Sequence, residues 1–320
     1  MIATAPSAAP PTLATDLAQP AISTSHLSKS FGDRVAVKDV TFDLPMGHVI
    51  GFVGPNGAGK TTTIRMLLGL IRPSSGSAHV LGESISNPAT YLNRVGALIE
   101  TPAFYPSLSG TDNLRVLCSL GNLDRHRIAA LLHSVGLSGR EGDKVGSYSL
   151  GMKQRLGVAA AMLPDPDLLV LDEPANGLDP EGIIEMRELL LSLRERGKTH
   201  FVSSHLLGEL EQVADWLVMI KSGEVIYTGP TSDLTSRQSS GFVLATSSAP
   251  RLHALKLLTE RMGFPSSLNG DHLWVTAPSE AAGRVNEEAM KAGITLTEIR
   301  PVQPTLEQTF LDMISGDMHA

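Results

Sequence analysis

The chain has 320 residues, of which 42% are hydrophobic and 18% charged, so it can bury the core of one large domain and a smaller one. This composition excludes a wholly disordered chain, and the formal charge of −7 argues against a protein that binds nucleic acid mainly through a basic surface. The single cysteine, Cys118, excludes an internal disulfide and a zinc site built from several thiolates, and we expect it to be a small buried side chain in a reduced protein.

Residues 1–20 are rich in Ala, Pro, Ser and Thr and contain few large apolar side chains. They lack the positive and continuous apolar regions of a secretory signal, and we predict a disordered tail. No stretch of the sequence approaches the roughly 18 uncharged apolar residues of a membrane-spanning helix. We therefore expect a cytoplasmic chain unless another protein recruits it to a membrane.

Short strands are predicted over residues 21–53, where apolar and polar residues alternate between turn signals at 31–33 and 45–47. The last of these strands, residues 48–53, is apolar enough to be buried on both faces of a sheet. A helical pattern follows over residues 62–70. This succession indicates the start of an α/β domain.

Helical patterns dominate residues 106–164, which we expect to form an insertion between strands of the sheet. Two further buried strands are predicted at residues 168–171 and 200–203, with a helix over residues 180–197 between them. Strands that alternate with helices are typical of a mainly parallel sheet covered by helices.

The pattern changes after residue 229, and residues 241–300 suggest a second, smaller α+β unit. Strands are predicted at 242–245, 273–275 and 294–299, with helices at 251–262 and 281–292 between them. This order fits a split βαβ domain. A last amphipathic helix is predicted over residues 304–314.

A glycine-rich loop joins the first buried strand to the helix that follows it. Its residues are Gly54, Pro55, Asn56, Gly57, Ala58, Gly59, Lys60, Thr61 and Thr62, and they match the pattern G-x-x-x-x-G-K-[ST]. The glycines allow consecutive backbone N–H groups to face inward and surround phosphate oxygens, and the helix adds its positive N-terminal end. In this pattern Lys60 supplies charge to the outer phosphates and the Thr61 hydroxyl binds Mg²⁺.

Two acidic residues, Asp172 and Glu173, follow the buried strand at 168–171. In an open parallel sheet, ligands bind at the carboxyl ends of the strands. We therefore expect Asp172 to hold Mg²⁺ and Glu173 to polarise the attacking water. The two motifs together predict hydrolysis of a nucleoside triphosphate.

Residues 148–155, Y-S-L-G-M-K-Q-R, resemble the signature sequence of the ATP-binding cassette (ABC) family, usually written L-S-G-G-Q. Ser149 and Gly151 keep the serine and the second glycine, whereas Tyr148, Leu150 and Met152 depart from the pattern. The family's other motifs follow in the expected order. By this resemblance Phe31 stacks on adenine, Asp179 lies in the loop between two nucleotide sites, and His205 contacts the γ-phosphate.

One departure concerns the loop in which this family usually has a glutamine. Glu100 stands there and is followed within a few residues by P-A-F-Y-P. This substitution resembles exporter ATPases associated with bacitracin resistance and with immunity to lantibiotic peptides. We expect Glu100 to meet Mg²⁺ or its waters and to couple the ATP site to a membrane partner.

The resemblance covers residues 21–229 and implies a P-loop NTPase core with a mixed, mainly parallel sheet, an antiparallel β subdomain and the helical insertion. It implies a homodimer, or a paired cassette, that encloses two ATP with Mg²⁺, so that Ser149 and Gly151 of one copy cover the ATP held by the other. It also implies an integral membrane permease as partner, which would hold the chain on the inner face of the membrane. Residues 230–320 remain as an accessory domain, and no nucleic acid is expected as a partner.

Two alternatives remain open at this point. One is a soluble cassette ATPase that acts on nucleic acid or ribosomes, although the chain lacks the long coiled-coil insertion of the DNA-repair relatives and the second cassette of translation factors. The other is a degenerate cassette that only binds ATP, against which Lys60, Asp172, Glu173 and His205 argue because all four are present.

Overall fold

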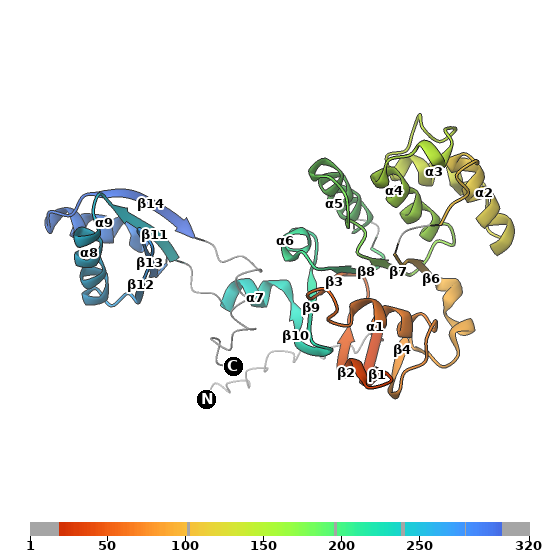
Figure 1. The fold of residues 1–320 in the computed structure, drawn as a ribbon, viewed down its shortest axis with the longest axis horizontal. Coiled ribbons are helices and arrows are strands. Elements are labelled where there is room, and N and C mark those ends of the chain that lie inside the picture. Colours follow the sequence, from red (N-terminus) through yellow and green to blue (C-terminus); the bar gives the residue numbers. More distant parts are fainter. Residues whose placement is uncertain (1–18, 101–102, 195–196, 238–240, 279, 303–320) are drawn as a thin grey trace, which may run out of the picture.

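The computed structural model describes residues 19–100, 103–194, 197–237, 241–278 and 280–302. Their strands form a six-stranded mixed sheet and two four-stranded antiparallel sheets (Figure 1). This is the predicted α/β class, with a mainly parallel core sheet, an antiparallel subdomain and, as a separate unit, a small α+β fold. The predicted helix at 304–314 and all but the last two residues of the predicted tail lie outside the described residues.

The first antiparallel sheet has the order β2-β1-β4-β5, formed by β1 (Ile22–Phe31), β2 (Arg34–Leu44), β4 (Ser75–Val80) and β5 (Glu83–Ser84). These first two strands have 10 and 11 residues, so the prediction of short strands is wrong for them. It is confirmed for Val49–Val53, which has five residues. Irregularities in the strand pairing near His26 and Asp39, which both have positive φ, let the strands continue through polar residues. The side chains of these two residues are hydrogen bonded at 2.6 Å.

The six-stranded sheet has the order β10-β9-β3-β8-β7-β6, and all its neighbouring pairs are parallel except β10 with β9. Every residue of β3, β7 and β8 is buried, as expected for central strands covered on both faces. The strands are β3 (Val49–Val53), β6 (Val95–Leu98), β7 (Leu168–Asp172), β8 (Thr199–Ser204), β9 (Trp216–Lys221) and β10 (Glu224–Pro230).

The predicted helical insertion is present between β6 and β7. It contains α2 (Gly110–Gly121), α3 (Arg127–Ser134) and α4 (Leu150–Ala161), and Cys118 is buried within it as expected. The other helices of this part are α1 (Lys60–Leu67), α5 (Pro180–Arg194), α6 (Leu207–Leu210) and α7 (Thr231–Arg237). Three short 3-10 turns cover Pro88–Thr90, Leu92–Arg94 and Val145–Ser147.

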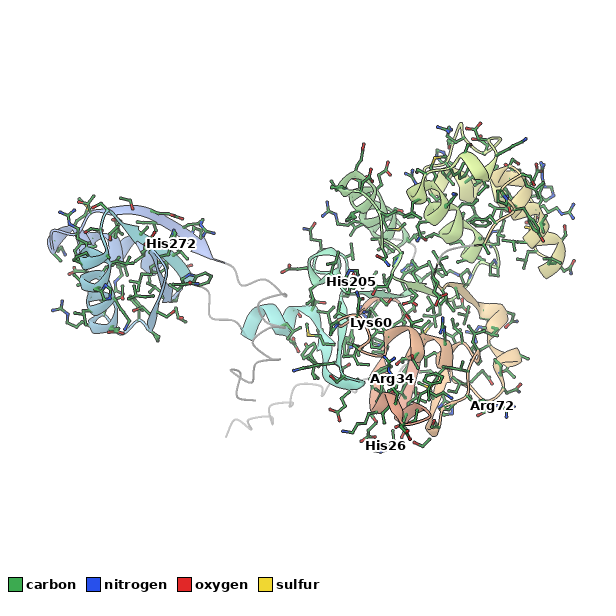
Figure 2. The ribbon with its side chains drawn as sticks, in the orientation of Figure 1. His26, Arg34, Lys60, Arg72, His205 and His272 are labelled. Carbon is green, nitrogen blue, oxygen red and sulfur yellow. The ribbon has the colours of Figure 1, made fainter. Side chains whose placement is uncertain are left out.

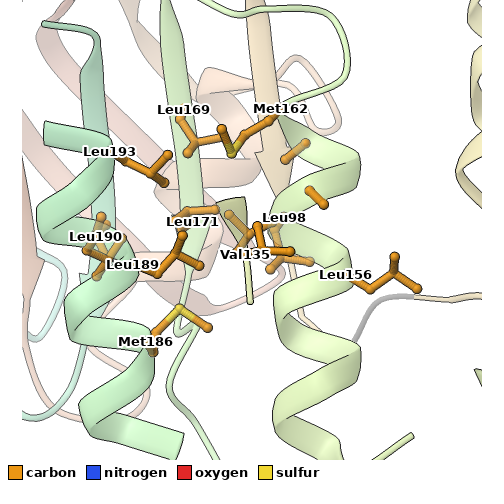
Figure 3. Packing of buried hydrophobic residues seen from close by; sticks show 14 of the residues in the cluster. Leu98, Val135, Leu156, Met162, Leu169, Leu171, Met186, Leu189, Leu190 and Leu193 are labelled. Atoms are coloured by element: carbon orange, nitrogen blue, oxygen red, sulfur yellow. The ribbon is translucent and has the colours of Figure 1, made fainter. Parts of the chain in front are cut away.

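Separate hydrophobic clusters cover the two faces of the six-stranded sheet. On one face, Ile50 and Phe52 of β3 pack with α1 and with the antiparallel sheet. On the other face, Leu169 and Leu171 of β7 lie between α4 and α5 (Figure 3). Packing on both faces fixes the strand ends at the edge where the glycine-rich loop and the acidic pair lie.

The last sheet has the order β12-β13-β11-β14, and α8 (Ala249–Arg261) and α9 (Ala281–Lys291) accompany it. Its strands are β11 (Gly241–Thr246), β12 (Ser266–Asn269), β13 (His272–Thr276) and β14 (Leu296–Val302). This is the connectivity of the predicted split βαβ arrangement. The prediction missed β12, because this edge strand has the polar sequence S-S-L-N and shows no apolar alternation.

None of the helices in the described ranges is long and apolar enough to cross a membrane.

Candidate functional site

A cavity of about 590 Å³ lies where the end of β7, the start of α1 and the hairpin formed by β1 and β2 meet. Its lining brings together most of the residues that the sequence predicts for the phosphate site. Among them are Phe31, Asn56, Gly57, Gly59, Lys60, Thr61, Thr62, Glu100, Asp172 and Glu173. The acidic pair therefore faces the glycine-rich loop, although more than 100 residues separate the two motifs in the chain.

The glycine-rich loop needs glycine at two positions because neighbouring backbone comes close. A side chain at Gly54 would place its Cβ 2.2 Å from the carbonyl oxygen of Ile220, and one at Gly59 would place it 2.5 Å from that of Ala36. Gly59 also has a φ of +109°, which L-residues rarely adopt, and α1 begins at the next residue. The loop thus turns sharply into α1, and the first N–H groups of this helix are available for an anion.

Lys60 is buried, and its ammonium group contacts oxygen atoms of the loop and of the acidic pair. Nζ donates to the carbonyl oxygens of Gly54 at 2.6 Å and of Pro55 at 3.4 Å. It also lies 3.0 Å from Oε1 of Glu173. A buried charge requires such partners, so the lysine is held by atoms that a phosphate group could replace.

Glu173 lies directly after β7 and is held from three sides. Its backbone N–H donates to Oγ of Ser203 at 2.9 Å, and its Oε2 lies 2.7 Å from Nδ1 of His205. With a φ of +50°, it is one of the few non-glycine residues in the left-handed region. Figure 2 labels His205 and Lys60, the two residues that bind this carboxylate.

The environment of Glu173 keeps its carboxylate ionised. Burial acts to raise its pKa, but hydrogen bonds and positive charge from His205 and Lys60 outweigh burial and lower the pKa below the ordinary value. An ionised carboxylate can accept a proton from water, which is the requirement for a general base.

Asp172 and Thr61 provide the oxygen donors that Mg²⁺ prefers. The Asp172 carboxylate is buried at the end of β7 and accepts a hydrogen bond of 2.5 Å from Oγ of Ser203, and Thr61 faces the same cavity. Mg²⁺ in phosphate sites is usually held by one or two protein oxygens, with phosphate and water completing the shell. These two residues fit that role, in which Mg²⁺ would neutralise phosphate charge.

Glu100 also faces the cavity, but its carboxylate is bound elsewhere. It forms an ion pair and hydrogen bond with Arg65 of α1, and both side chains are substantially exposed. Glu100 has a φ of +60° and lies just after β6. To bind Mg²⁺, as the sequence predicts, it would have to exchange Arg65 for the ion.

Ser149, Gly151 and Asp179 lie outside the cavity lining, at the starts of α4 and α5. Other predicted residues are also outside this lining, namely Gly54, Pro55, Ala58 and His205. Ser149 is the N-cap of α4, where its Oγ accepts from the N–H of Met152 at 3.2 Å, and Gly151 lies in the first turn of that helix. The Oδ1 of Asp179 accepts from the N–H of Gly182 at 3.0 Å, at the start of α5. The contact of Ser149, Gly151 and Asp179 with a nucleotide therefore stays a prediction, because it would require the nucleotide held by a second copy of the chain.

Sequence reasoning assigned no role in the site to several residues of the cavity lining. Arg34 and Ala36 come from β2, Asn176 follows the acidic pair, and Leu150 and Gln154 come from α4. Only the position of Arg34 directly after the turn that follows Phe31 could have suggested it from the sequence.

Comparison with known proteins identifies the family. Residues 37–176 match the family model described as ABC transporter. The chain is 38% identical to the bacitracin transport ATP-binding protein BcrA of Bacillus licheniformis over 300 residues, which cover 92% of this chain and 97% of that protein. The chain belongs to the ABC transporter ATP-binding proteins. It is an ATPase of this family.

Other members of the ABC family support the same assignment. The lantibiotic transport ATP-binding protein SrtF of Streptococcus pyogenes is 42% identical over 201 residues, which cover 63% of this chain and 87% of that protein. A solved structure of an ATP-binding subunit of an ABC transporter superposes with a TM-score of 0.60 at 30% identity, covering 68% of this chain and 92% of that one. The BcrA match covers 92% of the chain, so it must also include part of the last sheet, which β11 to β14 form.

Proposed function

We propose that this chain is the ATP-hydrolysing subunit of an ABC exporter for a drug, an antimicrobial peptide or a lipid-like compound. The observation that carries the proposal is that Lys60, Thr61, Asp172 and Glu173 face one cavity. The transport names of BcrA and SrtF support the exporter class and the type of cargo.

The proposed hydrolysis begins with an exchange at Lys60. A γ-phosphate would replace Glu173 as a partner of the ammonium group, because both are anions that compete for the same donor. Losing Lys60 would raise the pKa of Glu173 and make its carboxylate a stronger base. His205, whose Nδ1 lies 2.7 Å from Oε2 of this carboxylate, would keep it oriented towards the attacking water.

We propose that two copies, or this cassette and another, close around two ATP. Ser149 and the first N–H groups of α4 would cover the phosphates held by the opposite copy, because a helix N-terminus attracts anions. The cassette would comprise residues 21–229, and residues 230–320 an accessory domain. An integral membrane permease would hold the pair on the inner face of the membrane.

Purification from membranes tests this proposal. The tagged chain is expressed with its genomic neighbours, membranes are solubilised in mild detergent, and we expect an integral membrane protein to co-purify in a fixed ratio together with ATPase activity. Lys60→Ala is expected to retain the partner and lose the activity. Full ATPase activity in a chain that never associates with a membrane protein would contradict the transport role.

A further inference from the structure

We propose that Arg34 binds the nucleotide phosphate nearest the ribose, as a second cation beside Lys60. The inference rests on the proposed ATP site and assigns a contact within it that the glycine-rich motif does not contain. Arg34 is the first residue of β2 and lines the cavity with Phe31 and Lys60. Figure 2 labels Arg34 and Lys60 in the cassette.

The charges of the cavity lining favour this role. Of the two cations in the lining, Lys60 is paired with Glu173, whereas Arg34 forms no ion pair with any carboxylate in the described ranges. The anions of the lining are Glu100, Asp172 and Glu173, so the wall has a formal charge of −1 (two cations and three anions). Besides Lys60, Arg34 is therefore the cation of this lining that can pair with a triphosphate, and it need not give up a carboxylate to do so.

The hairpin places Arg34 between the predicted base site and the phosphate loop. Phe31 and Arg34 are paired residues across the two-residue turn Gly32–Asp33. Lys29 Nζ lies 5.0 Å from the centre of the Phe31 ring and donates to the carbonyl oxygen of Arg72, which holds this end of the hairpin in place.

Beyond Arg34, strand β2 comes close to the glycine-rich loop. Ala36 is two residues beyond Arg34, about 7 Å along the strand and on the same face. Its carbonyl oxygen is the atom that a Cβ at Gly59 would meet at 2.5 Å. From the turn of the hairpin the order is therefore Phe31 at the end of β1, Arg34 and Ala36 on β2, and then the start of α1. A nucleotide with its base on Phe31 and its outer phosphates at Lys60 would pass Arg34 at the phosphate next to the ribose.

If Arg34 binds the phosphate next to the ribose, its loss should change the affinities for ADP and ATP differently from the loss of Lys60. A guanidinium group at that phosphate stabilises ADP and ATP equally, because both carry it. Lys60 at the outer phosphates stabilises ATP more than ADP. Loss of a hydrogen bond to a charged group corresponds to a change of about tenfold in affinity.

Equilibrium binding without turnover tests the proposal. The dissociation constants of ADP and of a non-hydrolysable ATP analogue are measured by calorimetry for the parent, Arg34→Ala and Arg34→Lys. We expect Arg34→Ala to weaken both nucleotides by the same factor, about tenfold, and Arg34→Lys to recover part of that loss. Lys38→Ala is the matched control, because Lys38 lies on the same strand and pairs with Glu224 outside the cavity lining.

Three outcomes would overturn the role of Arg34. These are unchanged ADP affinity in Arg34→Ala, an equal loss in Lys38→Ala, and a loss confined to the ATP analogue, which would place the guanidinium at the outer phosphates. A parent chain that binds neither nucleotide would instead contradict the proposed function itself. Thermal unfolding of each variant without nucleotide checks that the hairpin still folds.

Discussion

The central residue of the site is Glu173, whose carboxylate binds Lys60 on one side and His205 on the other. We expect Glu173→Gln to bind ATP with near-parental affinity and to lower the turnover rate by about 10²–10⁴, because the amide keeps the shape but cannot accept a proton. Steady-state phosphate release and nucleotide binding measure the two effects separately. Parental turnover in this variant would exclude Glu173 as the base.

The pair formed by Arg65 and Glu100 supports a second residue-scale prediction. Glu100, which stands where this family usually has glutamine, pairs with the guanidinium of Arg65 on α1. In the proposed transporter this pair would link the ATP site to the loop that reaches the permease. We expect Glu100→Ala and Arg65→Ala each to reduce drug- or peptide-stimulated ATPase activity, and the double variant to lose no more than either single one. In that double-mutant cycle, additive losses would show that the pair is not coupled.

At the scale of elements, the turn into α1 depends on Gly59. We expect Gly59→Ala to destabilise the cassette by about 1–3 kcal/mol, because the backbone strain at this φ is joined by a clash with the carbonyl oxygen of Ala36. Gly57→Ala is the control, since Gly57 also has positive φ but its Cβ would meet no atom within 4 Å. Thermal unfolding should therefore show a larger loss for Gly59→Ala, and equal losses would contradict the clash.

A pH-sensitive ion pair joins the starts of the neighbouring parallel strands β6 and β7. Arg94, just before β6, donates to Asp167, just before β7, at 2.8 Å. The hydrogen bond from Arg94 is the main cause that lowers the pKa of Asp167, and it outweighs the opposing effect of partial burial. A carboxyl group whose pKa is lower in the folded state stabilises the fold above its unfolded pKa of about 3.8, and this stabilisation is lost as the pH falls through the lower, folded pKa.

We expect Asp167→Asn to lower the free energy of unfolding at pH 7 by up to about 1 kcal/mol, the usual range for an exposed ion pair. The difference from the parent should shrink as the pH falls below 4. Denaturant unfolding at pH 7 and pH 3.5 measures this change. In an Arg94→Gln background the substitution should have a smaller effect, since among the described residues only the longer contact of 3.7 Å with Lys198 remains. A full effect there would show that the pair with Arg94 is not its cause.

The sequence was sufficient for features that short segments determine. The glycine-rich loop and the acidic pair could be located because each follows a continuous apolar strand. The helical insertion could be located because its apolar residues recur at helical spacing. Features that depend on contacts between distant segments could not be located. β12 is polar and forms by pairing with β13, the capping role of Asp179 depends on the start of α5, and Arg34 enters the site because Ala36 packs against Gly59.

At the scale of the whole molecule, one copy of the chain presents only part of the proposed ATP enclosure. Ser149 and the start of α4 carry N–H groups that the proposed mechanism assigns to the nucleotide of another copy. A variant that binds ATP without hydrolysing it should therefore accumulate in the closed, paired state, because hydrolysis is the step that reopens it. This reasoning links the residue-scale effect of Glu173→Gln to the assembly.

We expect Glu173→Gln to be a dimer at saturating Mg-ATP and a monomer without nucleotide, as measured by size-exclusion chromatography with light scattering. Adding Ser149→Arg should keep this variant monomeric while ATP still binds, because the larger side chain blocks the surface that would meet the opposite phosphates. Ser267→Arg, on the exposed edge strand β12, adds the same charge away from the ATP site and is the control, which should dimerise normally. If Glu173→Gln stays monomeric with ATP bound, the two-copy enclosure is wrong, whereas dimerisation without nucleotide would place the contact between copies outside the ATP site.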